Sequence, residues 1–260
     1  MRFCSLGSGS GGNSLVVEAR SGASASRVLV DCGFTQREFG LRLGRAGLAP
    51  ADLDAVFVTH EHGDHIGSAL ALARRHHLPV WMSRGTWRAV GGRSNLPAEL
   101  LNFARDGETI AVGSLQLQPF TVPHDAHEPL QLTCGDGARR LGVLTDTGAA
   151  TAHLLQRLAG CEALVLECNH DRDMLARSRY PAALKARIGG AYGHLANDSA
   201  ADILASCLHA GLRHVVAAHL SRENNHPELA SQALAMACGV SAREIVVADQ
   251  FSGFGWLSLV

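Results

Sequence analysis

The segment that most constrains the fold of this chain is a run of metal-binding side chains, His60-Glu61-His62-Gly63-Asp64-His65. It follows an apolar stretch at residues 55–58 that reads as a strand, with Thr59 between them. A helical H-E-x-x-H zinc site is excluded, because the residue four after His60 is Asp64. A tight loop loosened by Gly63 can instead turn these side chains into one space. Imidazole and carboxylate ligands suit zinc, manganese or iron, so the run predicts a metal centre at the end of a strand.

Short apolar and β-branched runs elsewhere predict further strands, several of them apolar throughout as in strands covered on both faces. The expected strands span residues 14–18, 27–31, 55–58, 79–82, 115–122, 140–145, 163–167, 214–218 and 244–248. Apolar spacing and capping residues predict helices at 66–77, 151–158, 197–210 and 227–238, with Asn197 and Asp198 capping the third. We therefore expect an α/β fold in which two packed, mixed β-sheets are flanked by helices, an αββα sandwich.

Additional metal ligands are expected where other apolar strands end. These strand-end residues are Asp31, His124, Asp146 and His219. The strand ends at one edge of an open α/β sheet are the usual place to build a site. A single strand-end aspartate is most often a turn former, so the prediction depends on their convergence. His60 and His62 can hold one ion and Asp64 and His65 a second, and each ion needs further ligands from these strand ends.

Length and composition limit the remaining possibilities. A chain of 260 residues suits one large domain over residues 1–260, and its net charge of −1 gives no overall basic field for a polyanion. Lys185 is the only lysine beside 22 arginines, which reflects either base composition or phosphate recognition by arginine. Seven scattered cysteines without a C-x-x-C pair predict reduced thiols and a cytoplasmic protein. Neither a signal peptide nor the roughly 18 apolar residues of a membrane span is expected.

The glycine-rich segment at residues 7–12 formally satisfies the dinucleotide-binding pattern G-x-G-x-x-G. It leads into a strand-like stretch at residues 14–17 and not into a helix, and it lacks the Gly-Lys-Ser/Thr ending of a phosphate-binding loop. We therefore expect no dinucleotide cofactor, and interpret the segment as a tight turn between strands near the edge that carries the site.

The metal-binding residues resemble the successive motifs of the metallo-β-lactamase superfamily, which has His124, Asp146 and His219 in this order after the H-x-H-x-D-H run. Within it the chain resembles the YycJ (WalJ) branch, whose members are assigned as DNA exonucleases. The matching segments are residues 5–13, 167–171, 180–181, 184–188, 193–197 and 219–225. The departures are Cys32, Cys168 and Ala196, and none of them is an expected ligand.

The resemblance implies two divalent metal ions per chain, zinc or manganese. One ion would be held by His60, His62, His124 and Asp146. The other would be held by Asp64, His65, Asp146 and His219, so that Asp146 bridges the pair. Asp31 would orient a ligand histidine.

The same resemblance implies hydrolysis by a hydroxide shared between two ions about 3.5–4 Å apart. Asp64 would orient or deprotonate that water. His194 matches a non-ligand histidine of the phosphodiesterase branches and would act as general acid or phosphate clamp, the alternative being a structural hydrogen bond. Four further residues are candidates for substrate contacts, for supporting the ligands, or for purely structural roles: His170, Arg222, Asn224 and Asn225.

The expected function is a DNA exonuclease of 5′ to 3′ polarity, with DNA as the partner. A small-molecule hydrolase of the same fold, acting on a cyclic phosphodiester, thioester or lactone, is the first alternative. His194, and a carboxylate at position 146 in place of a thiolate, favour phosphodiester chemistry. An RNA-processing nuclease is a weaker alternative, because residues 147–218 leave no space for a large inserted domain. A non-catalytic regulatory protein disagrees with the complete ligand set, and the sequence predicts no oligomeric state.

Overall fold

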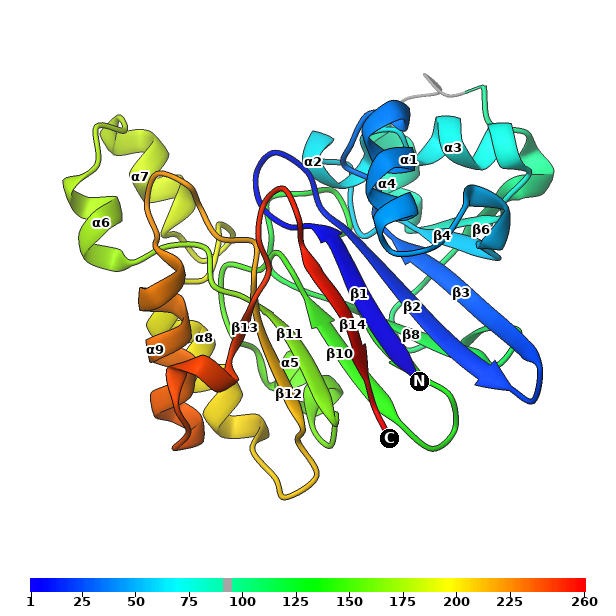
Figure 1. Cartoon of the computed structure of the whole chain (residues 1–260). Coiled ribbons are helices and arrows are strands. Elements are labelled where there is room, and N and C mark those ends of the chain that lie inside the picture. The colour runs from blue at the N-terminus through cyan, green and yellow to red at the C-terminus, as the bar shows by residue number, and fades with distance from the viewer. Residues whose placement is uncertain (91–94) are drawn as a thin grey trace.

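Two seven-stranded β-sheets pack face to face in this computed structural model, which describes residues 1–90 and 95–260, and helices cover their outer faces (Figure 1). The first sheet has the order β14-β1-β2-β3-β4-β5-β6. Its strands are β1 (Arg2–Gly7), β2 (Ser14–Ser21), β3 (Ser24–Val30), β4 (Ala55–Phe57), β5 (Val80–Met82), β6 (Leu101–Phe103) and β14 (Phe254–Ser258). Strands β14 to β3 pair antiparallel, whereas β3 to β6 pair parallel, so the sheet is mixed.

The second sheet has the order β13-β12-β11-β10-β9-β8-β7 and is mixed in the same way. Its strands are β7 (Ile110–Val112), β8 (Leu115–Thr121), β9 (Leu130–Gly135), β10 (Arg140–Leu144), β11 (Ala163–Glu167), β12 (His214–Ala218) and β13 (Val246–Val247). Strands β10 to β13 pair parallel, with β10 and β11 in the register Leu141 opposite Ala163. The parallel strands therefore present their carboxyl ends at one edge, where the site residues follow.

The helices occupy two outer layers. On the side of the first sheet lie α1 (Gln36–Arg45), α2 (Gly63–Ile66), α3 (Ala69–His76) and α4 (Arg84–Val90). On the side of the second sheet lie α5 (Ala152–Leu158), α8 (Asn197–Cys207) and α9 (Pro227–Cys238), and α6 (Arg172–Arg177) and α7 (Ala182–Ile188) extend beyond them. Short 3₁₀ helices span Pro50–Asp52, Ala98–Leu100 and Ala242–Glu244.

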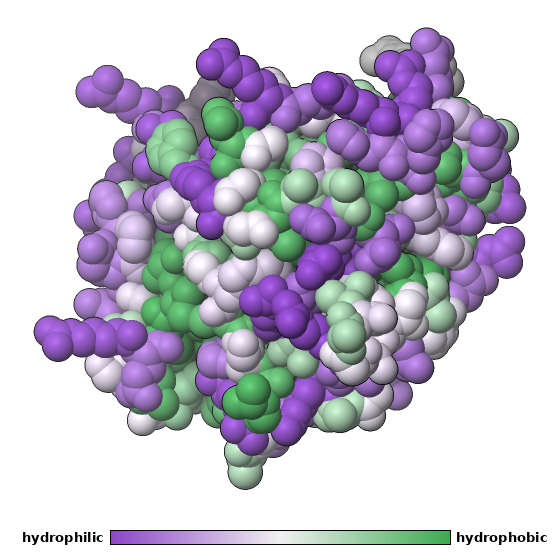
Figure 2. Space-filling view, turned by 45° about the vertical axis from the view of Figure 1, so that its right-hand side comes forward, coloured by the Kyte–Doolittle hydropathy of each residue, from purple (hydrophilic) through white to green (hydrophobic). Residues whose placement is uncertain are grey.

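Three buried apolar clusters fill the spaces between these layers. The middle cluster joins the sheets and includes Phe3 and Phe57 from the first and Leu117 and Val165 from the second. One outer cluster packs α5, α8 and α9 on the second sheet, and the other packs α1 and α3 on the first. On the face seen in Figure 2, the hydrophobic residues that the structure describes form separate patches between hydrophilic ones. The expected αββα sandwich is confirmed.

All nine expected strands are present, although the last is reduced to Val246–Val247. The single helix expected at 66–77 is wrong, because the chain forms α2 and α3 with a break at Gly67. Gly67 has φ of 30°, and a Cβ there would lie 2.5 Å from the Cys32 carbonyl oxygen, so this close approach interrupts the helix. The expectation that Asn197 and Asp198 cap the third helix is wrong, because α8 starts at Asn197 and its N-cap residue is Ala196, which makes no side-chain cap.

Five strands and four helices were not expected from the sequence. They are β1, β6, β7, β9, β14, α1, α4, α6 and α7. Among the described residues, every helix is too short or too polar to cross a membrane. All seven cysteines are free thiols.

Candidate active site

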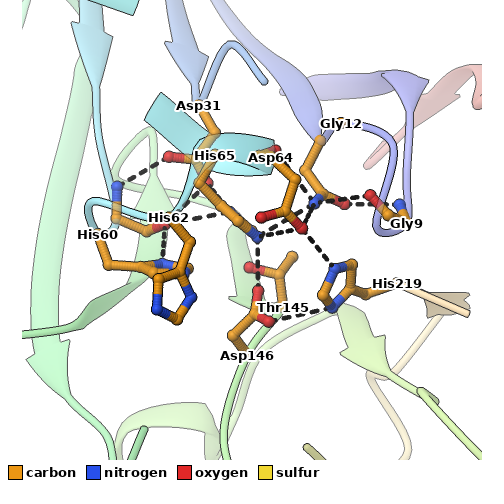
Figure 3. Close-up of polar contacts among 12 residues, drawn as sticks. Gly9, Gly12, Asp31, His60, His62, Asp64, His65, Thr145, Asp146 and His219 are labelled. Carbon is orange, nitrogen blue, oxygen red and sulfur yellow. Dashed lines mark hydrogen bonds and ion pairs between the residues drawn. The ribbon is translucent and has the colours of Figure 1, made fainter. Parts of the chain in front are cut away.

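The loop that follows β4 is held in place by Asp31, which lies at the end of β3 with a left-handed φ of 61°. Its carboxylate accepts hydrogen bonds from the Thr59 backbone N and Oγ1, both at 2.8 Å, and lies 2.7 Å from His65 Nδ1. The Asp64 carbonyl oxygen accepts a hydrogen bond from the Asn13 backbone N at 2.7 Å. The loop is thus anchored to β3 and to the turn between β1 and β2, as Figure 3 shows.

The remaining expected ligands reach the same space from the second sheet. His124 follows β8, Asp146 follows β10, and His219 follows β12 with a left-handed φ of 54°. His219 Nε2 lies 3.3 Å from Asp64 Oδ2, and its Nδ1 lies 3.1 Å from Asp146 Oδ1, so the two sheets meet at these side chains (Figure 3). The carboxyl ends of strands from both sheets therefore build one site.

The structure brings all seven expected ligands into groups whose ligand atoms lie within 4.8 Å of one another. The groups are His60, His62 and His124; Asp64, His65 and His219; His60, His65 and Asp146; and Asp146 with Glu167, His194 and His219. Asp146, like His60, His65 and His219, belongs to two of these groups. Such an arrangement can hold more than one divalent cation.

The hydrogen-bonding pattern of the site fits a bound metal. His60 Nε2 is buried and makes no hydrogen bond. Asp31 accepts a hydrogen bond from His65 Nδ1, so His65 Nε2 points toward Asp146 Oδ2 at 2.8 Å. His124 likewise donates Nδ1–H to the Gly193 carbonyl oxygen at 2.9 Å and turns Nε2 into the site. The unpaired His60 Nε2 and the Nε2 atoms of the other histidines, which converge on Asp146, form a site that a divalent cation can occupy.

The pKa values of the site residues indicate which of them hold protons before a metal binds. Burial would raise the pKa of Asp146, but His219 and His65 hold it well below its usual range. Burial would lower the pKa of His65, but Asp146 and Asp31 raise it to about 10. Burial, together with the charges of the neighbouring histidines, keeps the pKa of His60 well below its ordinary value, so this imidazole is neutral and free to bind a metal. A metal must displace protons from residues such as His65 in order to bind.

Glu167 is the main residue of the site that sequence reasoning missed. Its Oε1 lies 2.6 Å from His194 Nδ1 and 3.3 Å from His219 Nδ1, and its Oε2 accepts a hydrogen bond from the Thr147 backbone N at 2.8 Å. Burial would lower the pKa of His194, but the carboxylates of Glu167 and Asp146 raise it to about 9. The sequence could have indicated Glu167, because it is the last residue of an apolar strand, and Asp146 and His219 likewise follow apolar strands.

Three further missed residues touch the expected ligands. Asn13 Nδ2 lies 3.1 Å from His65 Nε2, and Asp125 Oδ1 lies 3.5 Å from His124 Nε2. Ser8 Oγ accepts a hydrogen bond from the His219 backbone N at 2.8 Å. Ser8 and Asn13 belong to the glycine-rich turn, which connects β1 to β2 beside the site as the sequence predicted.

The four peripheral candidates differ in where the structure places them. Both polar atoms of the Asn225 side chain form hydrogen bonds within the protein. Nδ2 donates to the Cys168 carbonyl oxygen and to Asn197 Oδ1, and Oδ1 accepts from Asn197 Nδ2 and the His226 backbone N. A role for Asn225 in substrate binding is therefore not supported. His170 is buried with Nδ1 unpaired among the described residues, and burial lowers its pKa to about 4. Asn224 is buried, whereas Arg222 is exposed and stacks over Phe251.

Comparison with known proteins gives the family. A sequence profile described as "Beta-lactamase superfamily domain" matches residues 26–248. The chain is 36% identical over 231 residues to Exodeoxyribonuclease YycJ of Bacillus anthracis, covering 88% of this chain and 86% of the relative. It is 31% identical over 232 residues to Exodeoxyribonuclease WalJ of Streptococcus pneumoniae, covering 88% and 85%.

The fold agrees with this match. The metallo-β-lactamase fold protein YhfI of Bacillus subtilis superposes with a TM-score of 0.71 at 17% identity, over 99% of both chains. The chain therefore belongs to the β-lactamase superfamily and, within it, to the YycJ-like proteins with the metallo-β-lactamase fold.

Proposed function

We propose that this chain is a dinuclear metal-dependent phosphodiesterase that degrades DNA as a 5′ to 3′ exonuclease. As a YycJ-like member of the superfamily it is a metal-dependent hydrolase of phosphodiester bonds. The observation that carries the proposal is the buried Asp146 carboxylate, which two ligand groups share and beside which His194 lies at 3.1 Å. Metal binding alone would not require this additional histidine, whereas proton transfer to a leaving group would.

The ligand sets of the two proposed metal positions come from the family resemblance, and the close approach of their side chains supports them. His60, His62, His124 and Asp146 would hold one zinc or manganese ion, and Asp64, His65, Asp146 and His219 would hold the other. The structure groups His60 with His62 and His124, groups Asp64 with His65 and His219, and places Asp146 within reach of His60, His65 and His219. When bound, such a pair supplies Lewis acidity and a nucleophile at neutral pH. Asp64 is partly exposed, so one of its oxygens can also orient the attacking water.

His194 is placed to protonate the leaving oxygen. Its side chain is 22% exposed while its carboxylate partner Glu167 is fully buried, so the imidazole reaches the solvent side of the site. Glu167 accepts the Nδ1–H, which leaves Nε2 to face the substrate. Because a phosphodiester releases an alkoxide, a general acid at this position lowers the barrier to cleavage.

The choice of DNA and of exonuclease action is supported by the names of the Bacillus and Streptococcus relatives, and the polarity by the resemblance of the sequence motifs. We also propose a cytoplasmic location, since all seven cysteines are free.

The test combines metal analysis with a substrate panel. We expect close to two transition-metal ions per chain, and release of mononucleotides from single- or double-stranded DNA beginning at the 5′ end. RNA, a chromogenic phosphodiester, a thioester and a lactone complete the panel. Activity confined to the thioester or lactone would refute the proposal, as would full activity after removal of all metal.

The His194→Ala variant tests the proton donor. We expect it to keep its metals and to lose turnover by a factor of roughly 10²–10⁴. His153→Ala is the matched control, because His153 lies on α5 and pairs with Asp106 away from the site. Retained turnover in His194→Ala would remove His194 from this role.

A further inference from the structure

A helical arm at residues 171–193 connects the end of the β11 region to His194 and contains α6 and α7. It projects beyond the other helices of its layer, as Figure 1 shows at the upper left. The arm carries five basic and two acidic residues, although the whole chain has a net charge of −1. Both tyrosines of the chain, Tyr180 and Tyr192, also lie on it. The arm thus combines positive charge with one exposed aromatic residue, Tyr192, while Tyr180 is half-buried.

The carboxyl end of the arm is fastened to the metal-ligand cluster. The Gly193 carbonyl oxygen accepts a hydrogen bond from His124 Nδ1 at 2.9 Å. Gly148 follows Asp146 by two residues, and a Cβ on it would lie 2.3 Å from the Ala191 carbonyl carbon and 2.5 Å from the Tyr192 N. The backbone at Tyr192 therefore rests directly on the loop that carries Asp146, and Tyr192 is 65% exposed.

Arg187 gives the arm a cation at the same edge. Its Nε donates to Asp125 Oδ2 at 2.5 Å, and the other oxygen of Asp125 lies 3.5 Å from His124 Nε2. The Arg187 side chain is 60% exposed, and neither of its Nη groups bonds to a residue that the structure describes. Asp125 thus fixes the orientation of the guanidinium and leaves both of its Nη groups free. A guanidinium in this state can bind a phosphate with two hydrogen bonds.

The other charges of the arm show which cations are available. Arg172 pairs with Asp198 and Arg177 with Asp173, both at exposed positions, as expected for a solvated surface. Arg179 is exposed and has no ion pair within the described part of the chain. A purely solvated helix pair would explain the first two arginines, but not a fixed guanidinium with free donors and an unpacked aromatic ring beside the site.

We propose that the arm is the binding surface for a single-stranded nucleic acid whose end enters the metal centre. Arg187 contacts a backbone phosphate next to the bond that is cleaved, and Tyr192 stacks on the adjacent base. Exposed aromatic rings and arginines are what single strands bind, because every unpaired base offers a face for stacking. This inference rests on the proposed function only in taking the substrate to be a nucleic acid.

The test measures binding separately from cleavage. The probe is a phosphorothioate DNA 12-mer with a 3′ fluorophore, free or annealed to its complement, titrated with metal-loaded protein in a fluorescence anisotropy assay. We expect Tyr192→Ala to weaken binding of the single strand about tenfold and to leave the duplex unaffected, while Tyr192→Phe binds like the native protein. Arg187→Gln should weaken binding of the single strand several-fold and reduce its dependence on salt. Arg243→Gln, an exposed arginine of the 3₁₀ helix Ala242–Glu244, is the control for loss of one charge.

Three outcomes would overturn the proposal. They are unchanged binding in both Tyr192→Ala and Arg187→Gln, equal losses for the single strand and the duplex, or a native protein that binds no single strand. Failure of the proposed function looks different: the arm variants would weaken binding, yet the native protein would cleave no oligonucleotide. Unchanged duplex binding by Tyr192→Ala separates loss of stacking from loss of folding, and Tyr192→Phe separates it from loss of the hydroxyl group.

Discussion

Glu167 joins the His194 side of the site to the loop that carries Asp146. One of its oxygens is shared by His194 and His219, and the other accepts hydrogen bonds from the backbone N of Thr147 and Leu195. These two backbone groups directly follow Asp146 and His194. Glu167 therefore positions the proposed bridging ligand and the proposed proton donor together, without contacting substrate.

The Glu167→Gln variant tests this positioning role. The amide has nearly the same shape but no charge, so the pKa of His194, which Glu167 helps to raise to about 9, should fall. A general acid must be protonated, and the decline of kcat/KM at high pH should therefore begin at lower pH in the variant. We expect turnover to fall by roughly 10–100-fold with metal content retained. An unchanged pH profile beside lower turnover would show that Glu167 has only a structural role.

At this scale the sequence predicted which side chains the fold brings close together, because each of them lies in a segment that follows an apolar strand. Glu167 also lies at the end of an apolar strand, but the family resemblance did not mark it as a ligand. Asn225 shows the limit of such reasoning. Asn225 lies close to His219 in the sequence, which suggested a role at the site. Its side-chain amide instead forms hydrogen bonds with that of Asn197, 28 residues away, and only the folded structure reveals this pairing.

Among the elements, the β2 strand buries a carboxylate in a cluster of arginines. The Glu18 side chain is fully buried, and its oxygens lie 2.7 Å from the Nε atoms of Arg2, Arg20 and Arg27. These arginines come from β1, β2 and β3 and join three neighbouring strands. Burial would raise the pKa of Glu18, but the three guanidinium groups lower it to about 2.

Removal of this charge should weaken the sheet in a pH-dependent way. The folded pKa of Glu18 is lower than in the unfolded chain, so its stabilisation is complete above about pH 5 and is lost as the pH falls toward 2. We expect Glu18→Gln to lower the free energy of unfolding by on the order of 2–3 kcal/mol at pH 7, and by less at pH 4. Urea denaturation measures both values. Glu108→Gln is the control, since its partner Arg105 is exposed, and it should change the free energy of unfolding by less than about 1 kcal/mol. An equal loss at pH 7 and pH 4 in Glu18→Gln would contradict the explanation.

The elements that the sequence missed share physical reasons. β6 and β7 have three residues each, which is too short for a periodic pattern to appear. The interruption between α2 and α3 depends on contact between Gly67 and the backbone at Cys32, which no local pattern encodes. The longer strands β10, β11 and β12 were predicted almost residue by residue, because strands covered on both faces are apolar throughout.

For the whole molecule, the site is also a junction between the two sheets. Loops that follow β3 and β4 of one sheet and β8, β10 and β12 of the other bring polar, ionisable side chains together. Buried Asp146 and His65 are compensated by each other when no metal is bound. The proposed metal ions would therefore link the two halves of the sandwich as well as serve chemistry, and folding and metal binding should be coupled.

This coupling predicts that chelation lowers the melting temperature. A ligand at 1,000 times its Kd stabilises the folded state by about 4 kcal/mol, which corresponds to roughly 8–16 °C in a chain of this size. Because the pKa of His65 is raised to about 10 without metal, binding releases protons, and the shift caused by metal should grow between pH 6 and pH 8. Differential scanning fluorimetry of metal-loaded and chelated protein at both pH values measures it. If the metal is shown to leave while the melting temperature stays constant, the centre does not hold the two sheets together.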